Sequence, residues 1–167
     1  MEKEISELGK KVYVLAKSLS EKRKSAAEKM SLDVEKILCS LGMKDTKFRV
    51  GLTEKEGNAV EQKCGPYGMD NIEFLISANP GSPLNPLAKI ASGGELSRVM
   101  LALKTILSDG DLAGTLVFDE IDTGISGKAA NAVASKLSKI SEKHQVLIIT
   151  HLAPIAARGD YNYYIYK

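Results

Sequence analysis

Two short apolar runs near the end of the chain, residues 115–118 and 145–150, each follow a segment with helical spacing of apolar residues. The helical segments cover residues 95–107 and 127–142. Because strands that alternate with helices pair in parallel through right-handed crossovers, this order predicts an α/β fold with a parallel sheet and flanking helices. The two runs contain almost no polar residues, so we expect both faces of these strands to be buried.

The first quarter of the chain reads as one long helix. Residues 2–42 contain no proline, and apolar side chains recur at steps of three and four, which is a heptad seam. The first seam consists of Ile5, Leu8, Val12, Leu15 and Leu19. Beyond Lys22 a second seam in shifted phase consists of Ala26, Met30, Val34, Ile37 and Leu41. Gly42 is well placed to end the helix.

We interpret the first seam as a coiled-coil arm and the second as the same helix docking onto a globular body. This interpretation divides the chain into an arm at residues 1–42 and a lobe at residues 43–167. The alternative is a single amphipathic helix that packs on its own domain throughout.

The segment between the long helix and the α/β pattern is predicted to be mostly extended. Residues 48–52 and 72–76 have strand patterns, and the polar, glycine-containing stretch between them suggests a hairpin or a longer excursion. Residues 79–86 are expected to form a loop because proline is dense there. At the other end of the chain we expect a helical turn at 154–157 and an edge strand at 161–166.

Composition places limits on the class of protein. The chain has 167 residues and a net charge of +2, which is too small to indicate nucleic-acid binding by itself. Cys39 and Cys64 lie far apart and fit free thiols in a reducing compartment. The sequence contains no signal-peptide pattern and no apolar run long enough to cross a membrane, so we expect no membrane association and a cytoplasmic location.

A serine and two glycines open the helix predicted to start at Glu95. Ser92, Gly93, Gly94 and Glu95 match a capping box, in which the serine caps the helix and the glutamate reaches back to the cap amide. Many helices begin in this way without a further function. However, two residues without side chains at a helix N-terminus also expose amides to an anion and allow a phosphate to approach closely.

The two predicted parallel strands end in side chains suited to phosphate chemistry. Asp119 and Glu120 follow the first strand, where open α/β sheets place their ligands, and they resemble a Walker B pair. In that reading Asp119 serves Mg²⁺ and Glu120 orients water, whereas the alternative is an ordinary polar strand end. His151 follows the second strand at the same edge and could donate a hydrogen bond to a phosphate. His144 reads as a surface or capping residue.

Taken together, the glycine turn, the acid pair and the histidine resemble the signature motif, Walker B, D-loop and H-loop of ABC-type ATPases. Residues 90–102 and 118–127 are similar to the RecN family, which is SMC-like and acts in bacterial DNA double-strand-break repair. The resemblance implies the C-terminal lobe of an ATPase head with ATP and Mg²⁺ as ligands. Ser92, Gly93, Gly94 and Glu95 would then belong to the phosphate-contacting signature motif, and His151 would sense the phosphate. Asp122 would be a D-loop aspartate that crosses the interface between two heads.

One part of that machinery is absent from the sequence. No Gly-x-x-x-x-Gly-Lys-Ser/Thr motif occurs. The resemblance implies that the phosphate-cradling P-loop belongs to an N-terminal lobe that this chain does not contain, and the sequence leaves open whether that lobe is encoded separately or lost. We therefore expect the isolated chain to hydrolyse ATP negligibly and to expose apolar surface where the missing lobe would pack. Its expected partners are that lobe, a second head in a homodimer, and DNA. The basic clusters at 10–11 and 22–24 support DNA binding only weakly.

Two other functions fit the sequence. The chain could be a non-catalytic interaction fragment, with a coiled-coil arm on a lobe that pairs with another head without turnover. It could also belong to another SMC-like recombination ATPase.

Overall fold

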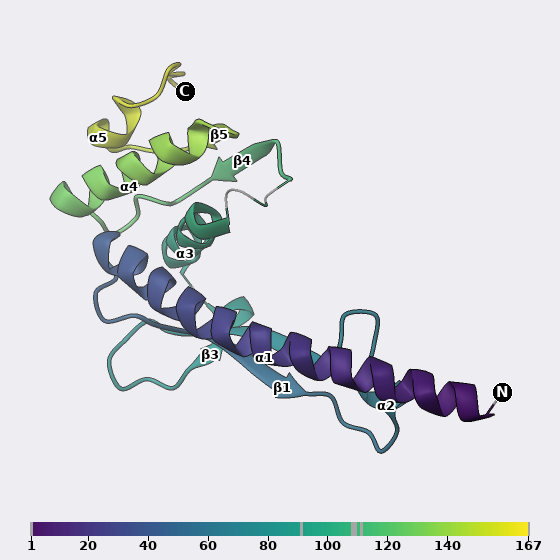
Figure 1. Ribbon diagram of the computed structural model, residues 1–167. Coiled ribbons are helices and arrows are strands. Elements are labelled where there is room, and N and C mark those ends of the chain that lie inside the picture. The colour runs from purple at the N-terminus through teal and green to yellow at the C-terminus, as the bar shows by residue number, and fades with distance from the viewer. Residues whose placement is uncertain (1, 91, 108–109, 111, 167) are drawn as a thin grey trace.

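The computed structural model describes residues 2–90, 92–107, 110 and 112–166. Ala91, which precedes the glycine turn, lies outside the described residues. A long helix, α1 (Glu2–Ser40), leads into a small antiparallel sheet and then into the α/β lobe (Figure 1). With 39 residues, α1 is roughly 60 Å long, and its N-terminal end projects away from the lobe (Figure 1).

Gly42 ends this helix as predicted. Its φ of 90° lies in the left-handed region, which glycine adopts without steric cost. The Met43 amide donates to the Leu38 carbonyl at 3.0 Å, and the Gly42 amide donates to Cys39 at 3.4 Å. These two bonds form a Schellman motif, which satisfies carbonyl groups at the helix end and turns the chain toward the first strand.

The antiparallel sheet confirms the predicted hairpin. Strand β1 (Lys47–Glu54) pairs along its whole length with β2 (Asp70–Ser77), and a short helix, α2 (Val60–Lys63), lies in the excursion between them. The predicted loop at 79–86 is wrong at its end, because β3 (Asn85–Pro86) pairs with β2 before the 3₁₀ turn η1 (Leu87–Lys89). Proline is tolerated there because β3 is a short edge strand.

The α/β pattern is confirmed. Helix α3 (Gly93–Leu107) leads to β4 (Thr115–Phe118), and α4 (Gly127–Ser141) connects β4 to β5 (Gln145–Ile148). The two strands pair in parallel, with Thr115 opposite Gln145. The short helix α5 (Ala153–Ala156) follows β5. The carboxyl ends of β4 and β5 therefore lie at the same edge of the sheet, as the sequence predicted.

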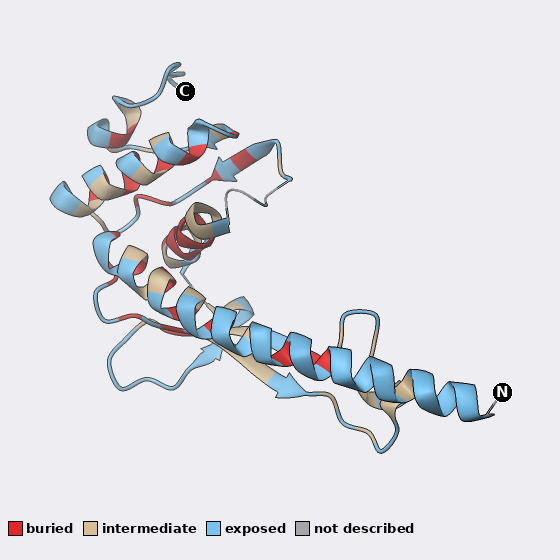
Figure 2. Cartoon of the chain, in the orientation of Figure 1, coloured by how far each residue is buried: buried red, intermediate tan, exposed pale blue. Residues whose placement is uncertain are grey.

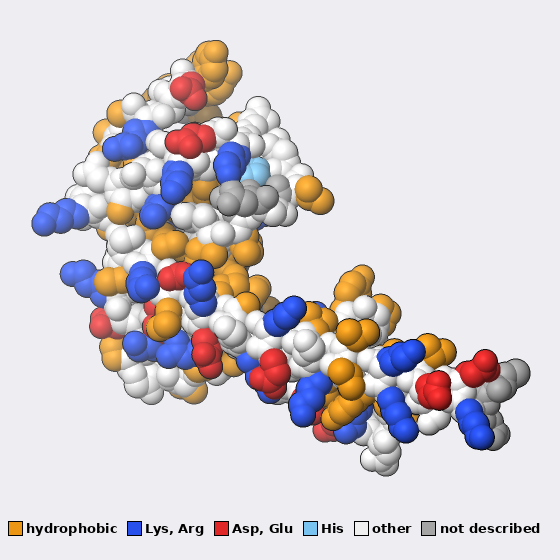
Figure 3. Space-filling model, viewed as in Figure 1, with side chains coloured by type: hydrophobic (Ala, Val, Ile, Leu, Met, Phe, Trp, Pro, Cys, Tyr) orange, Lys and Arg blue, Asp and Glu red, His pale blue; other side chains and the backbone are white. Residues whose placement is uncertain are grey.

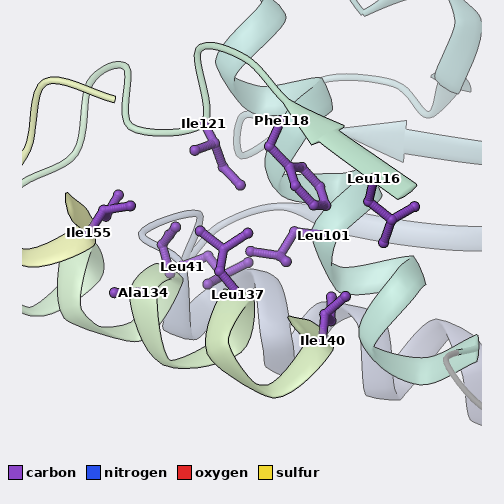
Figure 4. Close-up of a cluster of buried hydrophobic side chains, with 10 residues drawn as sticks. Leu41, Leu101, Leu116, Phe118, Ile121, Ala134, Leu137, Ile140 and Ile155 are labelled. Atoms are coloured by element: carbon purple, nitrogen blue, oxygen red, sulfur yellow. The ribbon is translucent and has the colours of Figure 1, made fainter. Parts of the chain in front are cut away.

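Two apolar clusters hold the sheets and helices together: α3 contributes buried residues to both, and the partly buried Ile37 of α1 packs against both. The first cluster fills the space between α4 and the parallel strands (Figure 4). It consists of Leu41, Leu101, Leu116, Phe118, Ile121, Val133, Ala134, Leu137, Ile140 and Ile155. The second cluster joins α1 to the antiparallel sheet and consists of Val34, Leu38, Met43, Phe48, Ile76, Val99, Ala102 and Leu103. Because α1 and α3 contact both clusters, they hold one sheet in place relative to the other.

The burial of the long helix changes along its length. The five residues of the first predicted seam are all exposed, from 38% at Leu19 to 70% at Leu15 (Figure 2). In the second predicted seam, Val34 and Leu41 are fully buried, but Ala26 is exposed and Ala27 is buried in its place. The phase of the docked face is therefore shifted by one residue from the prediction at that turn.

The predicted burial of both strand faces is wrong. Leu116 and Phe118 face the first cluster, whereas the alternating side chains on the other face are open: Val117 is 64%, Leu147 50% and Ile149 57% exposed (Figure 2). The strands are apolar on two faces, but this chain covers only one. The expected exposed apolar surface is therefore present.

The predicted edge strand at 161–166 is also wrong, since these residues form no strand and pair with neither sheet. Their large side chains, Tyr161, Tyr163, Tyr164, Ile165 and Tyr166, are each more than 80% exposed. Among the described residues no helix is both long and apolar enough to cross a membrane.

Candidate functional site

The glycine turn lies at the start of α3. The Ser92 hydroxyl accepts a hydrogen bond from the Glu95 amide at 3.4 Å, which confirms one half of the predicted capping box. Ser92 and Gly93 are exposed and Gly94 is buried. The first turn of this 15-residue helix therefore presents backbone amides at a partly open surface, which is a favourable position for an anion.

The two glycines lie in close contact with the segment that follows β4, Gly93 against a flexible side chain and Gly94 against the backbone. A methyl group on Gly93 would overlap the Glu120 carboxylate. A methyl group on Gly94 would lie 2.9 Å from the Glu120 carbonyl oxygen and 3.0 Å from Thr123 Cβ. The structure thus places the signature-like turn directly against the second acid of the Walker B-like pair, although the two are more than 20 residues apart in the sequence.

The acid pair itself has a constrained backbone. Glu120 has a φ of 55°, which is uncommon for a residue with a side chain. Its amide donates to Asp119 Oδ1 at 2.8 Å. Both residues are exposed. Unusual backbone conformations of this kind persist where the surroundings impose them, and the contact with Gly94 is one such constraint.

Two residues that sequence reasoning missed tie α3 to this segment. Ser97 Oγ donates to the Asp119 carbonyl at 2.7 Å. Arg98 Nη1 donates to the carbonyls of Thr123 at 2.8 Å and Ile121 at 3.3 Å. A signal for Arg98 was available, because it lies one turn from Gly94 on the buried face of α3, where a cation is unusual.

Arg98 is only 6% exposed, and its Nε is buried without a hydrogen-bond partner among the described residues. Burial lowers the pKa of the Arg98 guanidinium, and the charge of Glu95 opposes that shift. A buried cation that binds two main-chain carbonyls fixes the path of the chain between β4 and α4. The segment 119–123 is therefore held to α3 along its length.

The opposite side of the same segment binds the end of β5 through Asp122. Thr150 Oγ1 donates to Asp122 Oδ2 at 2.5 Å, and the His151 amide donates to the same oxygen at 2.9 Å. His151 Nδ1 lies 3.1 Å from this oxygen. Burial alone would raise the pKa of Asp122, but the hydrogen bonds from Thr150 and His151 outweigh it and hold the pKa below its ordinary range.

The candidate residues thus gather around one short segment. Asp119 and Glu120 lie against the start of α3, and Asp122 connects the same segment to His151. Two other features considered in the sequence analysis, His144 and the basic cluster at residues 22–24, lie outside this segment. His144 is buried, with Nδ1 2.7 Å from the Ala113 carbonyl, so the surface reading is wrong and the residue instead joins the end of α4 to the start of β4.

The basic cluster at residues 22–24 is largely paired with acids of the same chain. Arg23 Nη1 lies 2.9 Å from Asp70 Oδ2, and Lys24 Nζ lies 3.4 Å from Glu21 Oε1. Figure 3 shows acidic, basic and apolar side chains intermixed along the arm. This arrangement favours the reading of a solvated helix face over a continuous basic surface for DNA.

The donor set at the strand end fits Mg²⁺ as a single-carboxylate site. Mg²⁺ usually takes one or two carboxylates and completes its shell with water and substrate phosphates. Asp119 is exposed and provides hard oxygen donors beside the glycine turn. Among the described residues no group of three or more His, Cys, Asp or Glu side chains could hold a metal by itself. Any ion here would therefore take part of its coordination from water or a phosphate.

Sequence comparison with known proteins identifies the family. It is 53% identical over 160 residues to the DNA repair protein RecN of Treponema pallidum, covering 96% of this chain and 28% of that protein. It is 43% identical over 176 residues to the DNA repair protein RecN of Bacillus subtilis, covering all of this chain and 31% of that protein. By sequence the chain belongs to the RecN family. No family model matches it.

Solved structures give the fold. The Smc head domain of Pyrococcus yayanosii, solved with a coiled coil and joint, matches with a TM-score of 0.53 and 22% identity, covering 83% of this chain and 24% of that one. The Pyrococcus furiosus Smc head with an extended coiled coil matches with a TM-score of 0.51 and 21% identity, covering 95% and 46%. This RecN-family chain therefore has the fold of part of an Smc head domain. It spans less than a third of the length of the RecN relatives described above.

Proposed function

We propose that this chain supplies the signature-motif half of an ATP-hydrolysing head that acts in DNA double-strand-break repair. The observation that carries the proposal is the contact between Gly93 and Gly94 at the start of α3 and Glu120 after β4. It brings an anion-binding helix end and a pair of carboxylates to one edge of a parallel sheet. Identity to proteins named as DNA repair proteins supports the biological role.

The residues divide into two groups by chemistry. Ser92, Gly93 and Gly94 present amides and a hydroxyl to the terminal phosphate of a nucleotide, with Glu95 completing the first turn. Asp119 holds Mg²⁺ together with water and phosphate oxygens, and Mg²⁺ supplies charge neutralisation for the triphosphate. Glu120 and His151 act on the attacking water and the phosphate. The Glu120 carboxylate occupies the place that a side chain on Gly93 would take, and it is exposed.

The P-loop is contributed by another lobe, and the open face of the parallel sheet is its docking surface. Val117, Leu147 and Ile149 form a patch that this chain leaves uncovered. Beside it lies a hollow of about 240 Å³ between α3 and β4. Its lining consists of Leu96, Ser97, Met100, Lys104, Leu116, Val117 and Phe118. Exposing these apolar side chains to water costs free energy, and a lobe that covers them removes that cost.

The arm at residues 1–42 extends the head, as a returning coiled-coil helix does. Its apolar seam from Ile5 to Leu19 is exposed, and its heptad spacing suits packing against a second helix. Two such heads dimerise around ATP, with DNA as the substrate of the assembly. Because Arg23 and Lys24 are paired with acids, DNA contacts in our proposal involve the assembled head more than the 22–24 cluster.

Mg²⁺-dependent ATP hydrolysis tests the proposal. The chain is assayed alone and after mixing with a separately made P-loop lobe, with Glu120→Gln as the catalytic variant and Lys139→Gln on the exposed side of α4 as its matched control. We expect turnover only in the mixture, its loss with Glu120→Gln, and no change with Lys139→Gln.

Activity of the chain alone would contradict the requirement for a second lobe. Association of the two lobes without turnover would instead support a non-catalytic interaction fragment. An ATPase that Glu120→Gln leaves unchanged would show that the acid pair is an ordinary strand end.

A further inference from the structure

The covered face of α1 begins well inside the helix. Every residue from 3 to 15 is exposed apart from Gly9, which is partly buried. Ala16 is the first buried residue, at 6% exposure, and Ser20 and Ala27 follow at 2% and 8%. These three small residues recur at steps of four and seven, so they lie on one face of the helix. Between residues 3 and 27, that face is therefore covered from Ala16 onward (Figure 2).

The excursion between β1 and β2 contacts α1 in this region. Asp70, the first residue of β2, is 8% exposed and accepts hydrogen bonds from Ser20 Oγ at 2.6 Å and Arg23 Nη1 at 2.9 Å. A methyl group on Gly68 would lie 3.1 Å from Arg23 Nη1 and 3.2 Å from Leu19 Cδ2. Helix α2 of the same excursion also contacts α1. Gly68 and Asp70 therefore both reach the long helix between Leu19 and Arg23.

The end of this excursion, residues 65–70, is a closed turn, which we call the hairpin tip. The amides of Gly65 and Gly68 donate to each other's carbonyls at 3.0 Å. Gly68 has a φ of 89°, a conformation that glycine adopts without steric cost. The Lys55 side chain donates to the Gly68 carbonyl at 3.2 Å, and the Lys55 amide donates to the Met69 carbonyl at 2.8 Å. A turn bonded in this way has little freedom of its own, so it is suited to hold the helix.

The part of α1 before Ala16 has no such support within the described residues. Residues 2–15 form about 21 Å of helix at a rise of about 1.5 Å per residue. A helix of about 12–15 residues is only marginally stable in water by itself. The order of this part therefore depends on what covers it, and in this chain the cover begins at Ala16.

We propose that the hairpin tip is a latch that holds α1 against the lobe from Ala16 to Ala27. Residues 2–15 then bend and unwind independently of the lobe, and the latch sets the point at which this movement starts. Asp70 is its main contact, because one buried carboxylate binds two side chains of the helix. Release of the latch extends the free part to residues 2–26, about 37 Å of helix. All these contacts lie within this chain, so the latch is independent of ATP hydrolysis and of a second lobe.

Amide hydrogen exchange of the unmodified chain tests the latch without any substitution. The chain is kept dilute so that the exposed seams of two molecules do not associate. The first four amides of a helix lack a partner within it, so the comparison starts at residue 6. We expect the amides of residues 19–27 to exchange at least about tenfold more slowly than those of residues 6–15. Equal exchange across residues 6–27 would overturn the proposal.

Distance measurements between two nitroxide labels test Asp70 itself. One label is placed on α4 at Ser135, and the second on α1 at either Lys17, inside the latched part, or Lys29, beyond it. All three positions are exposed, and the two native cysteines are replaced by serine. We expect Asp70→Asn to broaden the distance distribution from Lys17 to Ser135 and to leave that from Lys29 to Ser135 unchanged.

Two further variants serve as controls. Asp33→Asn breaks an exposed ion pair on the same helix, so it should broaden neither distribution. Ser20→Ala removes one of the two side-chain hydrogen bonds to Asp70, so it should broaden the Lys17 distribution less than Asp70→Asn does.

An unchanged Lys17 distribution in folded Asp70→Asn would overturn the proposal. Equal broadening at Lys17 and Lys29 would also overturn it, because the whole helix would then have loosened. If Asp70→Asn does not fold, Ser20→Ala and the exchange pattern of the unmodified chain decide. Failure of ATP hydrolysis in the mixed-lobe assay leaves these outcomes as they are, so the two proposals fail separately.

Discussion

The Ser97 hydroxyl on α3 donates a 2.7 Å hydrogen bond to the main-chain carbonyl of Asp119 at the end of β4. This bond joins the helix that starts with the signature-like glycines to the first residue of the acid pair. The sequence does not predict this contact, because serine occurs on many helix surfaces and the acceptor is a backbone atom. It holds the backbone of Asp119 against α3.

Replacing this serine tests the link. Ser97→Ala removes a neutral hydrogen bond at a partly buried site, so we expect a loss of about 0.5–1.5 kcal/mol in the free energy of unfolding, measured with urea. Ser141→Ala is the matched control, because the Ser141 hydroxyl bonds only within its own helix and is exposed. A loss in the control as large as that in Ser97→Ala would argue against a special role for the contact.

Arg98 makes the stronger connection between α3 and the segment after β4. Arg98→Met keeps much of the apolar stem but leaves the carbonyls of Ile121 and Thr123 without their donor. We expect unfolding to become easier by about 1–3 kcal/mol. Lys139→Met, on the exposed face of α4, should change stability by less than about 0.5 kcal/mol. Equal effects of the two substitutions would contradict the buried-cation argument.

Replacing glycine by alanine should change stability in opposite directions at two positions. Gly94→Ala would place a methyl group 2.9 Å from a backbone oxygen, so we expect a destabilisation of about 1–3 kcal/mol. Gly9→Ala has open space and lies within α1, so it should stabilise the chain by up to about 1 kcal/mol. Thermal unfolding of both variants checks the pair, and a stable Gly94→Ala chain would show that α3 can shift away from Glu120.

The far end of the hairpin is tied to α1 through a carboxylate, and this tie depends on pH. Asp70 is 8% exposed and accepts hydrogen bonds from Ser20 Oγ at 2.6 Å and Arg23 Nη1 at 2.9 Å. Burial would raise the pKa of Asp70, but the bonds from Ser20 and Arg23 outweigh it, so the pKa lies below its ordinary value of 3.8. The unfolded chain therefore takes up this proton first as the pH falls.

It follows that the stabilisation from Asp70 is fully present above pH 3.8 and is lost as the pH falls through the folded-state pKa. Asp70→Asn should cost about 1–3 kcal/mol at pH 7, and the difference from the wild type should shrink in acid. Unfolding in urea across this pH range is the measurement. Asp33→Asn, which breaks a more exposed pair with Lys36, should show almost no difference at any pH. A constant gap for Asp70→Asn would contradict the titration argument.

The open face of the sheet predicts self-association. Val117→Thr with Ile149→Thr keeps the branched shape and the strand preference but reduces the apolar surface. We expect less light scattering at high protein concentration and weaker binding to the P-loop lobe. The free energy of unfolding should change little. Leu112→Thr, at a residue that is 99% exposed outside the patch, is the control and should affect neither property. Unaltered lobe binding in the double variant would place the docking surface elsewhere.

The sequence by itself determined the order and type of the main elements. Periodicity identified α1, the hairpin, both helices of the α/β lobe and both parallel strands, because these patterns reflect local geometry and the need to bury one face. It also predicted that the chain after β4 and the chain after β5 meet at one edge, since parallel pairing requires it. The candidate residues Ser92, Glu120 and His151 came from the same local patterns.

Tertiary structure alone decided which faces are covered and which partners the polar groups have. Apolar composition could not show that Val117 is open, because a strand buried on two faces looks the same whether or not its second cover belongs to the same chain. The aromatic residues at 161–166 have strand propensity but no strand beside them to pair with. Arg98 was assigned no role for the same reason: its partners are backbone carbonyls distant in the sequence, and only packing brings them within hydrogen-bond distance.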